Sequence, residues 1–254
     1  MSAALELRAL HGIPEVSPGA DLAAIIRAAL QRADIQLQSG DVLVIAQKIV
    51  SKSEGRFLDL RTLQPSARAI ALAESTGKAP CFVEAVLGES SEVVRTAPNT
   101  LIVRHRSGYV MANAGIDRSN VPGDEHTVLL LPRDCDAAAR ALRAALPAPE
   151  PAVIISDSFG RPWREGVVNV ALGSAGLAAL VDHRGGRDRQ GRVMQTTQVA
   201  IADALAAAAG LVLGEASEGT PVAHVRGFRY VAIEGSEDRG ASTLLRPRAS
   251  DLFA

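Results

Sequence analysis

Apolar residues along the chain switch between the spacing of helices and the continuous runs expected of buried strands. The first helical segment follows GIPEVSPG (12–19), in which two prolines and two glycines favour a shaped loop. Asp21 is placed to cap a helix that we predict to run to about Ala33. Its apolar stripe consists of Leu22, Ile25, Ile26, Ala29 and Leu30. This stripe predicts a helix that packs on a sheet.

Two continuous apolar runs predict strands at the centre of that sheet. DVLVIAQ (41–47) follows a turn around Gly40, and AVIISD (152–157) follows a proline-rich loop. Neither run alternates apolar with polar residues, which is typical of strands buried on both faces. Shorter runs predict a hairpin from LIVRH (101–105) and GYVMANA (108–114). Single strands are predicted at TVLLLP (127–132) and PVAHVRGF (221–228).

Three further helices are predicted between and after these strands. Pro65 and Ser66 begin an alanine-rich helix that stops at Gly77, and the other two helices span 134–146 and 198–209. The segments predicted to be irregular are GRPWREG, RGGRDRQGR and LVLGEASEGTP (160–166, 184–192 and 211–221).

Composition narrows the class of protein. A chain of 254 residues with 47% hydrophobic residues has enough apolar side chains for one large domain or two small ones. Its 27 basic and 28 acidic residues give a formal net charge of -1, so no overall field favours nucleic acid or an anionic membrane. Small bound partners are expected instead.

The cysteines and the amino terminus indicate the compartment. Cys81 and Cys135 are far apart and belong to no CxxC or Cys/His cluster, so we predict two reduced cysteines and neither a disulfide framework nor a structural zinc site. The segment MSAALELRAL lacks the features of a signal peptide, and no apolar run reaches about 18 residues. The sequence therefore predicts a cytoplasmic protein.

Two acids carry the clearest candidate chemistry. Asp157 ends a predicted buried strand and is followed by Ser158, while Asp117 lies in the small-residue loop of ANAGIDRSN. Carboxylates at the end of a sheet strand, with a hydroxyl beside them, suit Mg²⁺ or Mn²⁺ held against substrate phosphates. The alternative for Asp157 is a cap of the following turn. The five histidines form no HxH or HExxH pair, which disfavours a zinc hydrolase.

Lysine is rare in this chain, and two of the three lysines stand together. QKIVSK (47–52) follows a predicted central strand and supplies an amide, a hydroxyl and the ammonium groups of Lys48 and Lys52, which suit phosphate oxygens or a purine edge. The alternative is a pair of solvated side chains after a strand. No GxxxxGK[ST] motif occurs, and no GxGxxG follows a strand, so any nucleotide site uses another architecture.

Two weaker candidates for anion binding remain. GEASEG (214–219) has backbone N–H groups that could wrap a phosphate, and Glu215 could serve a second metal, although a mobile surface loop is the alternative. Arginines could clamp an anion with Trp163 beside them, but most are expected to be ordinary surface residues. These arginines are Arg161, Arg164, Arg184, Arg187 and Arg226.

Taken in order, the motifs resemble the coenzyme F420-0:L-glutamate ligases, also called F420-0:gamma-glutamyl ligases. The matching stretches cover nearly the whole chain. They are GIPEVSPGADL, GDVLVIAQKIVSKSEGR, ANAGIDRSNV, LLPRDCDAAARALR, VIISDSFGRPWREG, RGGRDRQGR and LLRPRASDLF. The resemblance implies a GTP-dependent enzyme that joins L-glutamate to F420-0, extends the tail through gamma-linked glutamates and passes through an acyl phosphate.

The resemblance also implies the ligands of the site. A first metal would be held by Asp117 and Asp157, and a second by Ser158 and Glu215. The nucleotide would contact Ile13, Pro14, Glu15, Val16, Gln47, Lys48, Lys52, Asn120, Leu213, Gly214, Ala216, Ser217, Glu218, Gly219 and Thr220. No covalent protein nucleophile is implied. The metals would be Mg²⁺ or Mn²⁺, and a requirement for a monovalent cation such as K⁺ is left open.

The implied fold is α/β (mixed α+β), with a central mixed sheet flanked by helices, and is neither Rossmann nor P-loop. Residues 1–254 would form one catalytic unit, with room for two subdomains and none for the reductase domain that some relatives carry at the C-terminus. A homodimer is implied, and the small residues of the helix near Ala200 suit close subunit packing.

Two departures from the family pattern leave alternatives open. Relatives commonly carry GQTDVAIG where this chain reads GVVNVALG, which places Val167, Val168 and Asn169 where polar or acidic residues are common. Ala204 stands where relatives often carry glutamate. The alternatives are a ligase of the same scaffold with another carboxylate or amine as substrate, and a nucleotide-binding protein without catalysis.

Overall fold

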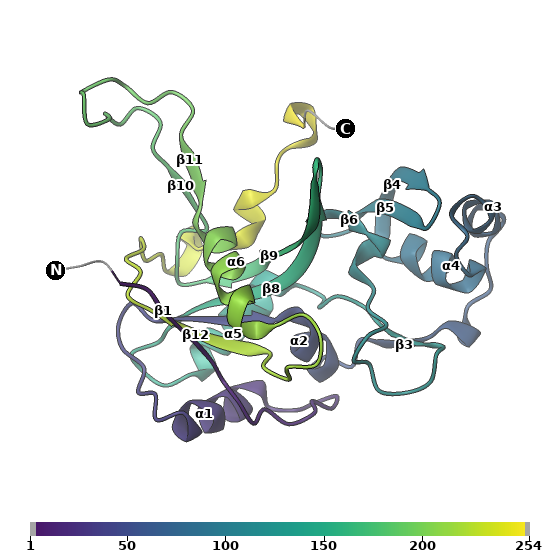
Figure 1. The fold of residues 1–254 in the computed structure, drawn as a ribbon, viewed down its shortest axis with the longest axis horizontal. Coiled ribbons are helices and arrows are strands. Elements are labelled where there is room, and N and C mark those ends of the chain that lie inside the picture. The colour runs from purple at the N-terminus through teal and green to yellow at the C-terminus, as the bar shows by residue number, and fades with distance from the viewer. Residues whose placement is uncertain (1–3, 252–254) are drawn as a thin grey trace.

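A five-stranded mixed sheet forms the centre of the protein (Figure 1) in a computed structural model that describes residues 4–251. Only β2 and β8 are parallel to each other, and the other neighbouring strands are antiparallel. The strand order is β1 (Glu6–Ala9), β12 (Val222–Arg226), β2 (Val42–Ala46), β8 (Ala152–Arg161) and β9 (Arg164–Ala175). A mixed α/β architecture is therefore confirmed.

Helices cover both faces of this sheet, which explains the continuous apolar runs. Leu43 and Ile45 of β2 face a core with α1 (Leu22–Arg32) and α5 (Cys135–Ala145). Val42 and Val44 face the opposite core, which is covered by α6 (Ile201–Leu213). Because successive side chains of a strand point to opposite faces, a strand between two helical layers has no polar positions.

The cap predicted for α1 is present, and α5 has a cap of the same kind. The Asp21 carboxylate accepts a hydrogen bond from the backbone N–H of Ala24 at 2.9 Å, and Asp134 caps α5 through Ala137 at the same distance. Each cap satisfies a backbone donor that has no partner within its helix. The boundaries of these two helices were therefore readable from the sequence.

A third hydrophobic core lies beside the central sheet, on the right of Figure 1. The predicted hairpin is present, and a third strand joins it to form the sheet β4 (Ser90–Ala97), β5 (Thr100–His105) and β6 (Val110–Ala112). The predicted helix after Ser66 is α3 (Ala67–Thr76), which ends at the left-handed Gly77. It packs beside α4 (Pro80–Gly88), which was not predicted.

Short elements complete the chain. A two-stranded sheet pairs β3 (Phe57–Asp59) with β7 (Thr127–Leu129), and α2 (Gln47–Ser53) follows β2 directly. The 3₁₀ turns are Leu60–Thr62, Asn113–Gly115, Gly235–Glu237, Ala241–Leu244 and Arg248–Ser250.

Two boundary predictions were wrong around Asp157. β8 does not end at Asp157 but continues to Arg161, and GRPWREG is the turn of a long β8–β9 hairpin rather than an irregular loop. The turn places Trp163 at a positive φ of 65° with 88% of its surface exposed. Antiparallel pairing with β9 supports β8 beyond the point where its parallel neighbour ends, and the apolar run alone did not reveal it.

The segment after β9 forms a projecting arm. β10 (Leu180–Asp182) pairs with β11 (Gln198–Ala200), and the polar RGGRDRQGR loop lies between them at the far end of the arm (Figure 1). The helix predicted from Gln198 starts three residues later and runs on to Leu213, so part of LVLGEASEGTP is helical. The last residues of LLRPRASDLF, 252 and 253, lie outside the described residues. None of the helices in residues 4–251 is long and apolar enough to cross a membrane.

Candidate functional site

A cavity of about 450 Å³ opens where β2 ends inside the central sheet. The last residue of β2, Ala46, pairs with Ser156, and beyond this pair β8 has a neighbour only on its β9 side. The Asp157 side chain lies on the same face of β8 as Ile155. The Ser158 side chain lies on the opposite face, which it shares with Ile154. Because the sheet is open here, side chains from both faces of β8 reach one cavity.

All of the residues that the resemblance assigns to nucleotide and metals line this one cavity. Around it the chain contributes the loop before α1, the first turns of α2, the turn after β6, the middle of β8 and the loop between α6 and β12. The lining includes Ile13–Val16, Gln47, Lys48, Lys52, Asp117, Asn120, Asp157, Ser158 and Leu213–Thr220. The structure thus brings the predicted residues together, and their individual roles remain predictions.

The QKIVSK side chains lie on helix α2, where residues four apart share one side of the helix. Lys48 and Lys52 are four residues apart, as are Gln47 and Ser51, so each pair shares one side of the helix. Gln47, Ser51 and Lys52 are buried, and Lys48 is partly buried. The alternative of two solvated lysines after a strand is therefore wrong.

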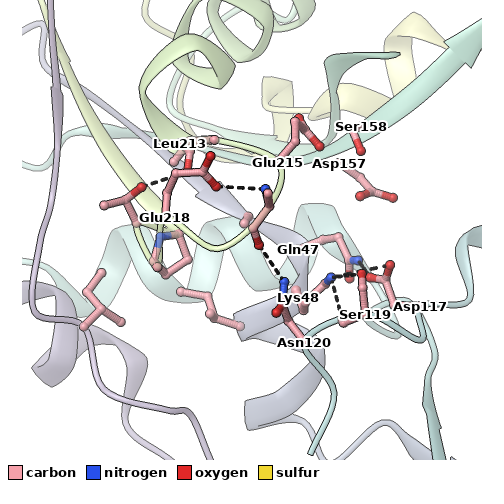
Figure 2. A pocket seen from close by; sticks show the side chains of 18 of the residues that line it. Gln47, Lys48, Asp117, Ser119, Asn120, Asp157, Ser158, Leu213, Glu215 and Glu218 are labelled. Carbon is pink, nitrogen blue, oxygen red and sulfur yellow. Dashed lines mark hydrogen bonds and ion pairs between the residues drawn. The ribbon is translucent and has the colours of Figure 1, made fainter. Parts of the chain in front are cut away.

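Asp117 is held in place by α2 (Figure 2). Gln47 donates a hydrogen bond from Nε2 to Asp117 Oδ2 at 2.7 Å, and Ser51 Oγ donates to Gln47 Oε1 at 2.9 Å. Lys48 Nζ lies 3.6 Å from Asp117 Oδ1 and donates to the backbone oxygen of Ser119 at 3.0 Å. The Asp117 backbone is fixed by two 2.9 Å hydrogen bonds with Leu129. Oδ1 therefore remains the freer oxygen of this carboxylate.

The small residues before Asp117 serve packing. Gly115 has a φ of +67°, and a side chain there would meet Met111 and Leu131. Its lack of a side chain allows a left-handed turn against the core.

Negative charge gathers at the Asp157 end of the cavity. Figure 2 shows Asp157, Ser158 and Glu215 at this end, and Asp117 lies close enough to Asp157 to affect its titration. The pKa of Asp157 is raised to about 8, because burial and the Asp117 and Glu215 carboxylates outweigh the opposing effects of the Ser158 amide and Lys48. Burial also raises the pKa of Asp117, against the opposing effects of Lys48 and Gln47.

This donor set fits a hard divalent cation that shares its ligands with a substrate. Two buried carboxylates raise each other's cost of ionisation, and a bound cation would relieve it. Within residues 4–251, no three His, Cys, Asp or Glu side chains are grouped as a protein cage for a metal. A site with few protein ligands is the kind that Mg²⁺ completes with water and substrate phosphates.

The other end of the cavity is formed by two loops. Lys52 is paired with Glu15 of the 13–16 loop, and Asn120 Nδ2 donates to the backbone oxygen of Ala216 at 3.0 Å. Glu218 accepts a 2.8 Å hydrogen bond from the Ala216 amide, so the loop after α6 is internally bonded. The predicted nucleotide loops therefore face each other across the cavity.

The candidate arginine clamps lie elsewhere. Arg226 is paired with Asp41 at 2.7 Å, Arg184 is paired with Asp182, and Arg187 donates to the backbone oxygen of Gly191. Neither these three nor Arg161 and Arg164 line the cavity. The expectation that most of these arginines are ordinary surface residues therefore holds, with Arg226 and its buried partner Asp41 as the exception, and lysines supply the cations of this site.

Sequence reasoning missed two hydroxyls of the cavity. Ser119 accepts a 3.3 Å hydrogen bond from Lys48, and Ser156 is fully buried with no partner for its hydroxyl among the described residues. Both stand inside motifs that were recognised, two residues after Asp117 and one before Asp157. Their proximity to those acids was the available signal.

The residues that depart from the family pattern lie on different surfaces of the protein. Asn169 lines the cavity opposite Ser158, and its amide packs against Gly210 of α6, where an added Cβ would overlap it. Val167 and Val168 lie farther along β9 and do not line it. Ala204 is exposed on α6, away from the cavity. Only Asn169 is therefore placed to change substrate contacts in this cavity.

Comparison with known proteins places the chain among enzymes of one kind. A sequence profile described as F420-0:Gamma-glutamyl ligase matches residues 12–227. The chain is 46% identical over 252 residues to the coenzyme F420:L-glutamate ligase of Methanothermobacter thermautotrophicus, covering 98% of each chain. It is 44% identical to the enzyme of that name from Methanopyrus kandleri, covering 94% of this chain and 93% of the relative. For the Methanocaldococcus jannaschii enzyme the identity is 40%, over 87% of each.

Proposed function

The chain belongs to the F420-0:gamma-glutamyl ligase family, and from this premise we propose that it joins L-glutamate to F420-0 through an amide bond. GTP is the proposed energy source, and repeated additions through gamma-linked glutamates are proposed to extend the tail. The observation that carries the proposal is a single cavity in which Asp117, Asp157 and Ser158 face the 13–16 and 213–220 loops.

We propose that the nucleotide and the metals bind at opposite ends of the cavity. The two loops would hold the nucleotide, with Gln47, Lys48, Lys52 and Asn120 contributing side chains between them. Asp117 and Asp157 would hold one Mg²⁺ or Mn²⁺, and Ser158 with Glu215 a second. Bound there, the metals would neutralise the charge that develops on the transferring phosphoryl group.

Lys48 supports this chemistry from the protein side. Its ammonium lies beside Asp117 and is fixed by the backbone of Ser119, so it is already oriented toward the metal end of the cavity. A preorganised cation needs little reorganisation when negative charge develops in the transition state. Lys52 is anchored by Glu15 in the loop that would contact the nucleotide.

We propose the following two steps for the amide synthesis. A carboxylate oxygen of the precursor attacks the terminal phosphorus of GTP, the bond to the β-phosphate oxygen breaks, and GDP leaves. The amine of glutamate then attacks the acyl carbon, phosphate leaves with its bonding electrons, and the nitrogen loses a proton. Each step uses a leaving group that the nucleotide supplies, so no covalent protein nucleophile is required.

Product analysis tests the proposal. Purified protein with F420-0, L-glutamate, GTP and Mn²⁺ should give glutamylated product, with one GDP formed per amide bond. An unchanged precursor mass with authentic F420-0 would contradict the reaction. A panel of other carboxylates and amines tests the second candidate, a ligase of altered substrate, which the amide of Asn169 in the cavity wall favours.

Asp157→Asn tests the metal assignment. We expect turnover to fall about 10²- to 10³-fold, the loss typical of removing one group that stabilises charge in the transition state. The melting temperature should stay unchanged or rise, because the wild-type carboxylate is destabilised by burial and by Asp117. Glu165→Gln, on the exposed part of the hairpin, is the matched control. Wild-type turnover in Asp157→Asn would overturn the assignment.

A further inference from the structure

A second cavity, of about 350 Å³, lies where the start of α5 meets β9 and the segment before the C-terminus. Its walls include Arg133 and Arg140 of the LLPRDCDAAARALR motif, and Arg239 from the C-terminal segment. The nucleotide and metal sites described above use none of these residues.

The three guanidinium groups of this cavity are available for a ligand. Arg133, Arg140 and Arg239 are exposed, and within residues 4–251 no ion pair or side-chain hydrogen bond engages their guanidinium groups. Arg143, on the same helix as Arg140, is by contrast paired with Glu150 and Glu234. Three unpaired cations around one cavity indicate an anionic ligand.

The acids in the same wall are already engaged. Asp136 accepts hydrogen bonds from the backbone N–H groups of Ser174 at 2.8 Å, Ala241 at 2.7 Å and Ser242 at 3.2 Å. Asp134 caps α5 through the Ala137 amide. Within residues 4–251 no ion pair joins either carboxylate to Arg133, Arg140 or Arg239, so three guanidinium groups face two acids that are bonded to the backbone.

The spacing of the arginines favours a ligand with two separated oxyanions. Arg133 lies two residues before the start of α5, whereas Arg140 lies within the helix. Arg239 approaches from a different segment. A planar guanidinium fork matches a carboxylate with two parallel hydrogen bonds, so separated forks suit a dicarboxylate better than one compact ion.

The two cavities share the β8–β9 hairpin. Leu172 lines the second cavity and Asn169 the first, and three residues along a strand correspond to roughly 10 Å. Asp157 pairs with Val170, two residues before Leu172 and on the same face of the sheet. A glutamyl group bound in the second cavity would therefore lie close to the proposed site of amide formation.

We propose that this cavity binds the carboxylates of a glutamate-type ligand, either free L-glutamate or the end of a gamma-glutamyl tail. The choice of ligand rests on the proposed function, whereas the dicarboxylate site rests on the unpaired arginines. Arg133 and Arg140 are the residues that recognise it, and Tyr109 and Cys135 contribute to the buried part of the wall.

Calorimetric binding tests the site without requiring turnover. L-Glutamate and gamma-glutamylglutamate are titrated into wild-type protein, with L-glutamine as the ligand that lacks the second free carboxylate. L-Glutamate and the terminal residue of gamma-glutamylglutamate each carry two free carboxylates. We expect at least one of these two ligands to bind about 10-fold or more tightly than glutamine, and the tighter one shows whether the site takes free glutamate or the end of the tail. Arg133→Gln and Arg140→Gln should each reduce that preference about 10-fold.

Arg68→Gln on α3 is the matched control, because Arg68 is exposed, has no ion pair among residues 4–251 and lies outside both cavities. Equal affinity for dicarboxylates and glutamine, or a preference that survives in both arginine variants, would overturn the proposal. So would tighter binding of inorganic phosphate than of either dicarboxylate. If the protein binds the dicarboxylates but has no ligase activity, only the proposed function is refuted. If it is an active ligase and the KM for glutamate is unchanged in both arginine variants, only the proposed binding site in the second cavity is refuted.

Discussion

Gln47 and Ser51 stand one helical turn apart on α2, and both are almost fully buried, at 2% and 0% exposure. Ser51 fixes which end of the Gln47 amide faces Asp117, because its hydroxyl donates to Oε1 and leaves the NH₂ group to donate to Asp117. Partners of this kind orient a metal ligand without touching the metal. We infer that the pair positions Asp117, and that Gln47 also lines the cavity.

Ser51→Ala should weaken Mn²⁺ binding about 10-fold, since removal of a residue that orients a ligand typically costs 10- to 100-fold in metal affinity. The Gln47 amide would lose the hydrogen bond that sets its orientation. Titration followed by electron paramagnetic resonance gives the affinity directly. Ser53→Ala on the same helix is the control, because Ser53 Oγ bonds only to the backbone of Val50. Equal losses in the two variants would contradict the positioning role.

At the scale of elements, β9 and α5 approach too closely for a side chain between them. A Cβ at Gly173 would lie 2.7 Å from the backbone nitrogen of Asp136 and closer still to the Cys135 carbonyl. This contact positions the start of α5, and with it Asp134 and Asp136, against the central sheet. The close approach depends on backbone atoms, which cannot move aside as a flexible side chain can.

Gly173→Ala should therefore destabilise the protein by about 1–3 kcal/mol, the range typical of overpacking a core. Urea denaturation of wild-type and variant protein measures the difference in the free energy of unfolding. Gly160→Ala on β8 is the control, because a Cβ there would meet nothing within 4 Å. A variant as stable as this control would show that β9 and α5 separate at little cost.

The elements that could be predicted were those whose signals are local. Asp21, Ser66 and Gly77 mark helix ends through their own hydrogen bonds or backbone angles, and β2 was visible as an apolar run. The continuation of β8 past Asp157 was hidden, because its polar and glycine-bearing end is supported by pairing with β9 rather than by burial. Tertiary pairing of this kind has no signature within a window of ten residues.

The site could be predicted in its members but not in their arrangement. The order of motifs along the chain predicted that Gln47, Asp117 and Asp157 belong to the site. They come together because β2 ends at Ala46, whose partner Ser156 directly precedes Asp157. The hydrogen bond between Gln47 and Asp117 spans 70 residues of sequence. Such contacts follow from where strands end in space, and sequence spacing does not contain that information.

At the scale of the whole molecule, a buried ion pair joins the start of β2 to the strand near the C-terminal end. Asp41 is 1% exposed, Arg226 donates to both of its oxygens, and His224 Nε2 lies 2.9 Å away. Burial favours a higher pKa for Asp41, but the hydrogen bonds from Arg226 and the neighbouring His224 outweigh it and lower the pKa. The folded state therefore binds the Asp41 proton more weakly than the unfolded chain does.

The sign of this shift predicts how stability depends on pH. A lowered carboxyl pKa contributes stability above the unfolded pKa, about 3.9 for aspartate, and the contribution is lost as the pH falls through the folded value. Asp41→Asn should cost about 3 kcal/mol at pH 7, because it leaves Arg226 without its buried partner. Urea denaturation should show that the difference shrinks below about pH 4. Glu165→Gln serves as an exposed control, and a difference that stays constant with pH would contradict the prediction.

Helix α6 has the composition of a surface through which two copies of the chain associate. Asp203 is the only polar side chain of IADALAAAAGLVL, and its carboxylate accepts a hydrogen bond from the Ala171 amide at 2.9 Å. The outer side of the helix is therefore apolar, and Leu211 is 84% exposed there. A helix that is apolar all round is normally covered, and its alanines would allow close approach by a symmetry-related copy.

Leu211→Glu should shift the protein toward the monomer in sedimentation velocity, since it would place a carboxylate in an apolar contact between subunits. Wild-type protein should sediment at twice the chain mass of 26.5 kDa at the same concentration. Ile70→Glu on α3 is the matched control, because Ile70 is also an exposed apolar residue, at 45%, but lies on a different helix. A monomeric wild type, or a dimer that survives in Leu211→Glu, would show that α6 is not the surface that joins the two copies.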